Sequence, residues 1–254
     1  TLGLSADALD EGFRAWLRKR LARYEGQFFF DDAGMPTVEA GELAVDQAPK
    51  DALARARLAG AYFLARDLEK AESTALKAIE LDPQQPIAHY LMAKIAFGVR
   101  KDEAEARRHA TSLASNGRDG YVVQTMLADL AEKRGDKAAM KAALEKAQAF
   151  DPTQADPLLG LYQLAEADKR EDEALALLRR MVKLDPMERA PWRALMTALV
   201  KRQLWDEAIG VGESAVFVDL FSAEIHAAYA HALTMKGRSK EAAMEVDAGL
   251  LAHP

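Results

Sequence analysis

The sequence predicts an all-α fold, a right-handed α–α superhelix of about six helix–turn–helix repeats. Pro83, Pro152 and Pro186 each follow a hydrophobic–Asp step, in the segments IELDPQQP, AFDPTQAD and KLDPMERA. Pro152 and Pro186 are 34 residues apart, whereas Pro83 and Pro152 are 69 apart, which is two periods of 34 plus one residue. The alanine-rich and aromatic-poor composition suits thin helices that pack closely. A fixed period near 34 residues indicates a repeat array.

The stretch before Pro83 shows how one period is built. Leu58, Ala59 and Tyr62 lie on one face of a first helix. Arg66 and Asp67 form a polar turn, and Ala71 and Ala78 lie along one stripe of a second helix. Asp82-Pro83 ends the second helix, because proline disfavours helix at the residue before it and has no backbone N–H.

The same template recurs along the chain. Later copies carry Leu127, Ala128, Gly135-Asp136, Ala147 and Pro152, and then Leu161, Ala174 and Pro186. Second helices restart in phase at DEAL, DEAI and KEAA, so that Ala174, Ala208 and Ala242 are spaced by 34 and 34 residues. One helix pair cannot bury its apolar face alone, and stacking on the next pair covers that face.

These positions resemble the tetratricopeptide-repeat family, which has a small–large apolar pair and Tyr in the first helix, alanines in the second, and then Pro. The array is expected over 51–254, with repeats near 52–85, 86–120, 121–154, 155–188, 189–222 and 223–254. The second repeat departs from the pattern, because it carries an extra residue in RKDEAEARR and ends in SNGRDG. In the fifth repeat, Trp192 stands at a frequent aromatic position, and Met196 replaces a small residue.

The resemblance implies a solenoid with first helices along a concave groove. We expect a protein or peptide partner to bind there, rings filling pockets and cations taking carboxylates. The groove residues that we predict are Arg57, Phe63, Tyr90, Lys94, Phe97, Thr125, Asp129, Lys133, Gln163, Arg193, Thr197, Lys201 and His231. The alternative is that these side chains are polar only because they face water. Ala56 and Gly60 replace the Lys and Asn of the subgroup that clamps peptide carboxylates, so the sequence does not favour that mode.

Residues 1–24 are predicted to form an amphipathic helix with Ser5 as its N-cap. Its apolar stripe is Phe13, Trp16, Leu17, Leu21 and Tyr24, and its basic residues are Arg14, Arg18, Lys19, Arg20 and Arg23. We favour a solvated basic face, with the stripe docked elsewhere, over a nucleic-acid or anionic-membrane contact. Residues 25–50 are expected to be a linker, in which Phe28, Phe29 and Phe30 pack on the first repeat.

The same N-terminal helix is similar to the closing helix of peptidase-MA-like (gluzincin) zinc hydrolase domains, which can precede tetratricopeptide arrays. The matching positions are Gly3, Leu4, Ser5, Leu9, Phe13, Trp16 and Leu17. This resemblance implies a second possible role, as the C-terminal accessory domain of a bacterial zinc hydrolase. The chain would then be a piece of a longer protein.

Motifs for chemistry are missing from the sequence. It has no His-Glu-x-x-His, phosphate-binding loop or cysteine, and we expect no enzyme activity, cofactor or metal. His226 and His231, five residues apart, point to different sides of a helix and suggest structural or surface roles. His89 and His109 show no ligand spacing. Gly210 and Gly212 suggest close helix contacts, and Glu171-Asp172-Glu173 suits a helix N-terminus.

We therefore expect a non-catalytic scaffold or adaptor that binds a protein or peptide partner. The formal net charge of -6 argues against general nucleic-acid binding. Nucleic-acid binding through the basic N-terminal helix remains a third hypothesis. Leu250 and Leu251 lack cover, which predicts self-association at the C-terminal end or a missing segment beyond it. The compartment stays open. We expect a soluble bacterial protein without a transmembrane segment, and we favour a periplasmic or secreted location over a cytoplasmic one.

Overall fold

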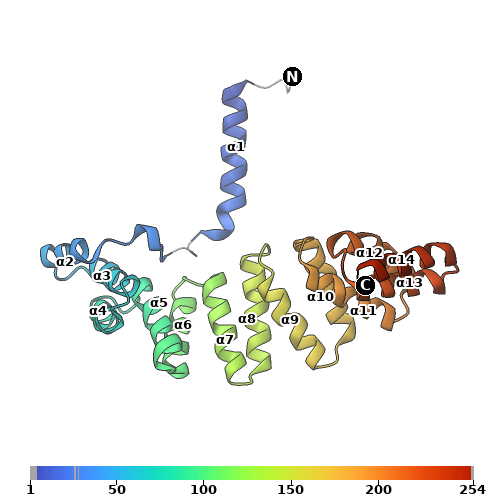
Figure 1. The fold of residues 1–254 in the computed structure, drawn as a ribbon. Coiled ribbons are helices and arrows are strands. Elements are labelled where there is room, and N and C mark those ends of the chain that lie inside the picture. Colours follow the sequence, from blue (N-terminus) through green and yellow to red (C-terminus); the bar gives the residue numbers. More distant parts are fainter. Residues whose placement is uncertain (1–4, 26, 28, 253–254) are drawn as a thin grey trace. The chain divides into compact units, whose positions relative to one another are not determined.

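The computed structural model describes residues 5–25, 27 and 29–252, and within them every regular element is helical (Figure 1). The chain divides into two compact units, Thr1–Pro152 and Thr153–Pro254, which we call the N-terminal and C-terminal modules. None of the helices in these described residues is long and apolar enough to cross a bilayer. The predicted all-α class is confirmed.

The N-terminal module contains eight α-helices within its described residues. They are α1 (Ala6–Leu21), α2 (Val38–Gln47), α3 (Ala52–Leu64), α4 (Leu68–Leu81), α5 (Pro86–Ile95), α6 (Glu103–Ser115), α7 (Tyr121–Lys133) and α8 (Lys137–Phe150). Short 3₁₀ turns lie at Ala22–Tyr24 and Asp32–Gly34, and a π-helical turn follows α5 at Ala96–Arg100. From α3 onward the helices form three consecutive pairs, each a first and a second helix.

The described part of the C-terminal module contains three further pairs. Its helices are α9 (Asp156–Ala167), α10 (Glu171–Leu184), α11 (Arg189–Lys201), α12 (Trp205–Val218), α13 (Ala223–Met235) and α14 (Ser239–Ala252). As in the N-terminal module, the odd-numbered helix is the first of each pair.

Each pair turns at one residue in the left-handed conformation. These residues are Arg66, Lys101, Gly135, Lys169, Gln203 and Gly237. The next residue donates its backbone N–H to a carbonyl five residues back, as Asp136 does to Ala131 over 2.9 Å. This bond satisfies a carbonyl at the end of the first helix. The turn residues are 34 residues apart except for one step of 35, from Arg66 to Lys101.

The π-helical turn accounts for that extra residue. In the second repeat, Asp102 donates its N–H to Ala96 over 2.9 Å, six residues back instead of five. A π-turn places one additional residue inside a helix without breaking it. The insertion noted between Pro83 and Pro152 is therefore absorbed at Ala96–Arg100.

Small residues lie where the two helices of a pair approach. Ala59, Ala71, Ala78, Ala147 and Ala208 are completely buried. Larger buried side chains, among them Leu91 and Met92 of α5, pack against alanines of the preceding pair. Alanine allows close backbone approach, and the repeating alanines of the sequence are thus confirmed as core positions.

One part of the expected linker is helical, which corrects that expectation. Thr37 caps α2 by accepting the N–H of Ala40, and Gly41 faces Leu58 of α3. Tyr62 donates its hydroxyl to Glu42 over 2.5 Å, and this hydrogen bond, with burial, raises the pKa of Tyr62 to about 12. Residues 38–47 thus pack against α3, the first helix of the first repeat.

The N-terminal helix forms as expected, but its stripe is exposed. Ser5 accepts the N–H of Ala8, as an N-cap should. Phe13, Trp16 and Leu21 are each about half exposed, so the expectation of a docked stripe is wrong for these described residues. Gly3 and Leu4 of the second resemblance lie outside the described residues.

Candidate functional site

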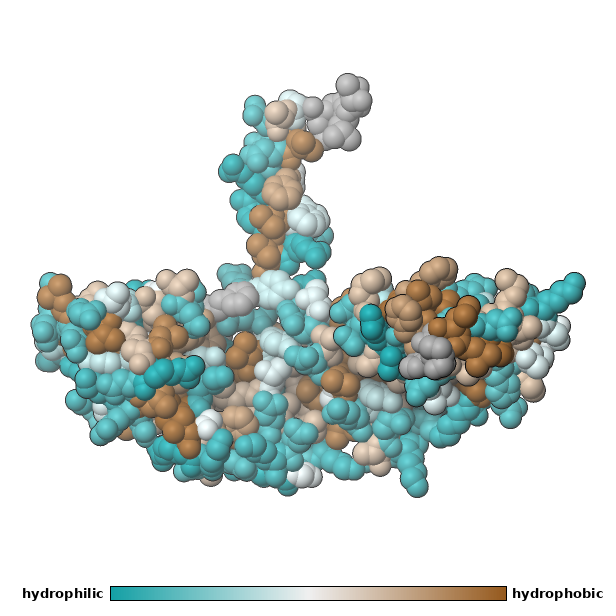
Figure 2. Space-filling view, viewed as in Figure 1, coloured by the Kyte–Doolittle hydropathy of each residue, from teal (hydrophilic) through white to brown (hydrophobic). Residues whose placement is uncertain are grey.

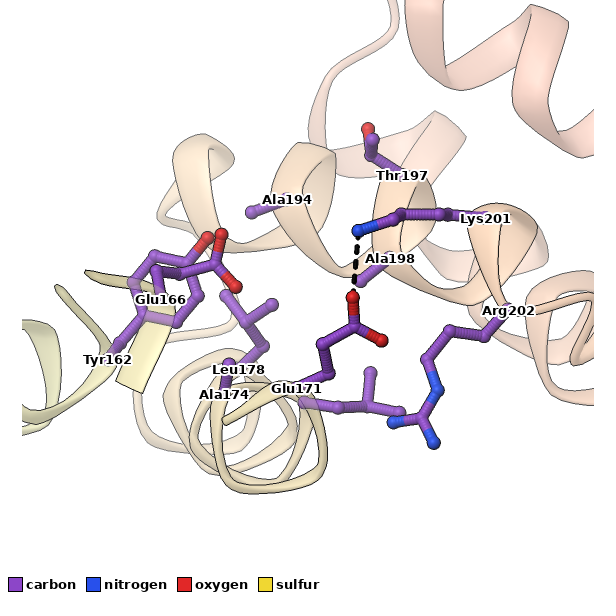
Figure 3. A pocket seen from close by; sticks show the side chains of 11 residues that line it. Tyr162, Glu166, Glu171, Ala174, Leu178, Ala194, Thr197, Ala198, Lys201 and Arg202 are labelled. Atoms are coloured by element: carbon purple, nitrogen blue, oxygen red, sulfur yellow. Dashed lines mark hydrogen bonds and ion pairs between the residues drawn. The ribbon is translucent and has the colours of Figure 1, made fainter. Parts of the chain in front are cut away.

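A cavity of about 220 Å³ lies in the C-terminal module between α9, α10 and α11 (Figure 3). Two of these, α9 and α11, are the first helices of adjacent repeats, and α10 is the second helix between them. The lining side chains are Tyr162, Glu166, Glu171, Ala174, Leu175, Leu178, Ala194, Thr197, Ala198, Lys201 and Arg202.

Small residues create the space. Ala174 and Ala198 line the cavity where longer side chains would fill it, and buried Leu175 and Leu178 add apolar surface. A concave, largely apolar surface with a few polar groups is the usual form of a recognition pocket.

Charged side chains surround this apolar surface. Lys201 Nζ lies 2.9 Å from Glu171 Oε1, and this hydrogen bond lowers the pKa of Glu171 and raises the pKa of Lys201 (Figure 3). Arg202 Nη2 lies 2.5 Å from Asp172 Oδ1, while its buried Nη1 has no hydrogen-bond partner within the described residues. A buried donor without a partner is costly.

Tyr162 and Glu166 complete the wall on α9. Partial burial, and secondarily the carboxylate of Glu166, raise the pKa of the Tyr162 hydroxyl. The phenol therefore remains a neutral hydrogen-bonding group at physiological pH. Together the lining can hold an apolar side chain while its polar groups contact the ends of that residue.

The predicted groove residues of the C-terminal module separate into two groups. Thr197 and Lys201 line the cavity. Arg193 instead donates from Nε to Asp219 over 2.5 Å, and His231 lies against the ring of Trp205 at 5.3 Å between centroids. Gln163 is exposed and is not among the residues lining the cavity.

In the N-terminal module, the predicted residues lie in several environments. Lys133 Nζ lies 4.2 Å from the ring centroid of Phe97. Partial burial raises the pKa of Asp129, and the positive charges of Lys94 and Lys133 oppose that rise. Tyr90 contacts two phenylalanines of the chain's own N-terminal segment.

The remaining three residues of that group have local roles. Phe63 is half-buried and packs against the buried core, so only part of its ring is available to a groove. Thr125 donates its hydroxyl to Val122 O of its own helix. Arg57 lines a cavity of about 370 Å³ with Met35, Pro36 and Gly41.

Sequence reasoning missed Tyr162, Glu166, Glu171 and Arg202 as lining residues. A sequence pattern could have identified Glu171 and Arg202. An acidic residue at the start of the second helix of one repeat is followed 30 residues later by a basic residue at the end of the first helix of the following repeat. The ion pairs Glu171–Lys201, Asp172–Arg202 and Asp206–Lys236 share this offset. The acidic cluster that we assigned to the helix dipole therefore also joins adjacent repeats.

Two histidine environments bear on metal chemistry. His226 is buried between Glu245 Oε2 at 2.9 Å and the carbonyl of Leu220 at 3.1 Å. The Nδ1 atoms of His89 and His109 lie 2.8 Å apart, a pairing that their spacing in the sequence did not predict. Within the described ranges, no three His, Cys, Asp or Glu side chains gather as a metal site would require.

Known proteins agree with this architecture. Models described as tetratricopeptide repeat match residues 37–95 and 122–154. The solved structure of YrrB, described as a TPR protein with an unusual peptide-binding site, superposes with a TM-score of 0.60 at 17% identity, covering 74% of this chain and 97% of that chain.

A structure of MamA AMB-1 superposes with a TM-score of 0.50 at 20% identity, covering 66% of this chain and 91% of that chain. At such identities the likeness shows the fold alone. No curated protein matches the sequence. The repeat matches and the paired helices agree with the predicted tetratricopeptide-repeat architecture.

Proposed function

We propose that the chain is a non-catalytic scaffold that binds a peptide or protein partner on the first-helix face of its C-terminal module. The observation that supports this most is the cavity between α9, α10 and α11, with its apolar lining and charged rim. Tetratricopeptide repeats commonly serve protein interaction, which agrees with this proposal.

The ligand that suits the cavity is an extended segment with one apolar side chain. That side chain would lie against Leu178, Ala194 and Ala198, and the polar groups of Tyr162 and Lys201 would contact the oxygens of the segment beside it. The volume of about 220 Å³ fits one large side chain and not a folded element.

Peptide display tests the proposal. Binders would be selected from a random library on the full chain and then measured against Ala194→Phe, which fills the cavity. The matched control is Ala190→Phe, an exposed position on the same helix that does not line the cavity. We expect Ala194→Phe to weaken binding by at least about tenfold and the control to leave it unchanged. Equal binding to both variants would remove the cavity as the site.

A second candidate role is self-association through the C-terminal end. Apolar side chains gather over the last helices (Figure 2), and Phe217, Phe221, Met244, Leu250 and Leu251 are all exposed. We propose a second copy of the chain as the occupant of this surface. Light scattering should show a concentration-dependent dimer that Phe217→Ser/Leu251→Ser abolishes. A monomer at every concentration would contradict this proposal.

The exposed stripe of α1 keeps the accessory-domain reading as a further candidate. Phe13 and Trp16 would be covered if α1 closed a zinc hydrolase domain of the peptidase-MA type. The open reading frame tests this directly, because such a domain must encode a His-Glu-x-x-His motif before Thr1. Its absence there would exclude the reading.

A further inference from the structure

A segment of the chain itself lies on the first helices of the N-terminal module. Residues 27 and 29–36, which we call the strap, contact α3, α5 and the start of α7. The expected packing on the first repeat is confirmed for Phe30, which lies against Gly60, whereas the ring of Phe29 contacts Tyr90 of the second repeat. Phe28 lies outside the described residues.

The contact with α3 requires a glycine. A Cβ atom at Gly60 would lie 2.8 Å from Met35 Sδ and 3.3 Å from Phe30 Cε2. These distances are shorter than ordinary van der Waals contact, so Gly60 leaves the space that the two side chains use. The same two side chains pack against the buried core of the first repeats.

The contact with α5 is aromatic. The Tyr90 ring lies 5.7 Å from Phe29 in an edge-on arrangement and 5.1 Å from Phe30 in a tilted one, both measured between centroids. Such pairs add roughly 0.5–1.5 kcal/mol each to the burial of the rings. Two neighbouring phenylalanines therefore share one tyrosine.

The contact with α7 replaces a helix cap. Gly120, at the N-cap of α7, provides no side-chain cap, and the N–H of Tyr121 donates to Gln27 Oε1 over 2.9 Å. A Cβ at Gly120 would lie 2.9 Å from Gln27 Cγ, so this glycine also leaves room for the strap. The strap thus satisfies a helix terminus that the array leaves open.

We propose that this face is a peptide-recognition surface, and that the strap is an exchangeable ligand held in cis. The partner that fits it in trans carries two adjacent aromatics and a methionine five residues after the second, as in Phe29-Phe30-x-x-x-x-Met35. This proposal does not depend on the cavity of the C-terminal module.

Two features make the strap exchangeable. Its contacts with α3 and α5 are side-chain packing, and its one regular element is the 3₁₀ turn Asp32–Gly34. Phe29, Phe30 and Met35 are only half-buried. Segments with few buried contacts open at low free-energy cost. A tethered ligand has an effective concentration in about the millimolar range, so it masks the surface from weaker trans partners.

The test uses the full chain with a weakened strap. Phe30→Ala/Met35→Ala removes the two side chains that contact Gly60, and hydrogen exchange over residues 27–36 reports release of the strap. A labelled peptide, EGQFFFDDAGMPT, then reports trans binding by fluorescence anisotropy. Met187→Ala/Met235→Ala is the control, because it truncates two exposed apolar side chains of the other module that lie in neither proposed surface.

We expect the strap variant to exchange faster at residues 27–36 and to bind the peptide at least about tenfold more tightly than the wild type. The control variant should behave as the wild type does, and alanine at the peptide's Phe30 and Met35 positions should abolish binding. Adding Gly60→Leu to the strap variant should also abolish binding, with an unchanged circular dichroism spectrum. A strap that stays protected, or a released strap without tighter peptide binding, would overturn the proposal.

Discussion

Gly210 and Gly212 lie two residues apart on α12 but meet different surroundings. A Cβ at Gly212 would lie 2.5 Å from Cδ2 and 2.6 Å from Cγ of Tyr229 on α13, whereas nothing lies within 4 Å of a Cβ at Gly210. The expected close helix contact is therefore confirmed for Gly212 and wrong for Gly210. The sequence could not separate the two, because both are helix-interior glycines.

Alanine at these two positions should have opposite effects on stability. Gly212→Ala forces Tyr229 to move and should lower the free energy of unfolding by roughly 1–3 kcal/mol. Gly210→Ala should raise it by about 0.5–1 kcal/mol, because alanine favours the helix and meets open space. Urea unfolding of the two variants beside the wild type measures both. Effects of the same sign would contradict the packing described for α12.

The His89–His109 pair makes stability depend on pH. His89 Nε2 lies 2.9 Å from Pro83 O and must donate, so His89 Nδ1 accepts from His109 Nδ1–H. His109 Nε2 then carries no proton and is buried without a hydrogen-bond partner. Burial, the neighbouring His89 and Arg108 lower the pKa of His109 from 6.5 to about 4, and Glu105 Oε1 at 3.9 Å does not offset them.

The unfolded chain therefore binds a proton at His109 between pH 6.5 and 4, and the folded chain does not. This contribution to stability is complete above pH 6.5 and is lost as the pH falls toward 4, amounting to up to about 3 kcal/mol. His109→Asn keeps a donor beside His89 without the titration. Urea midpoints at pH 7.5 and 5 should fall further for the wild type than for this variant, and equal falls would refute the assignment.

At the scale of elements, the left-handed turn sets the repeat. Glycine occupies it at Gly135 and Gly237, whereas Lys169 and Gln203 adopt the same conformation with a side chain. Lys169→Gly should stabilise the chain and Gly135→Ala should destabilise it, each by about 1 kcal/mol, because only glycine adopts positive φ without steric cost. Thermal unfolding of both variants provides the check. Destabilisation by Lys169→Gly would show that its lysine side chain matters more than the turn.

The repeat could be predicted because each of its signals lies within a short stretch of sequence. An apolar pair, a polar turn, spaced alanines and Asp-Pro recur at a fixed interval, and each has its own structural meaning. The extra residue of the second repeat was expected in RKDEAEARR, residues 100–108, whereas the π-turn absorbs it at Ala96–Arg100. The sequence showed that one residue was inserted, but it carried no local signal for a π-turn. The helical part of 25–50 was missed because Gly34-Met35-Pro36 suggested a linker, although Thr37 and Glu39 are helix-start signals.

The site was less predictable than the repeat. Thr197 and Lys201 were placed on the inner face by helix phase, and they do line the cavity. Whether a first-helix residue faces open space depends on the lengths of its neighbours, which is why Phe63 is packed and Arg193 is paired with Asp219. The strap could not be foreseen, because its contacts join residues far apart in sequence, such as Gln27 and Tyr121.

At the scale of the whole molecule, the two modules present first-helix faces in different states. In the N-terminal module, the strap covers Gly60 and Tyr90. In the C-terminal module, the cavity beside Ala194 and Lys201 is open. A partner without the aromatic–methionine pattern should therefore bind the C-terminal module, while the strap stays in place.

Methyl NMR tests that central claim most directly, because Ala174, Leu178, Ala194 and Ala198 place methyl groups in the cavity lining. The chain, labelled at alanine and leucine methyls, would be titrated with a display-selected peptide. We predict that these four residues shift, while Ala106 and Ala110 of α6, buried in the other module, do not. Saturable binding that leaves all four cavity methyls unmoved would contradict the account.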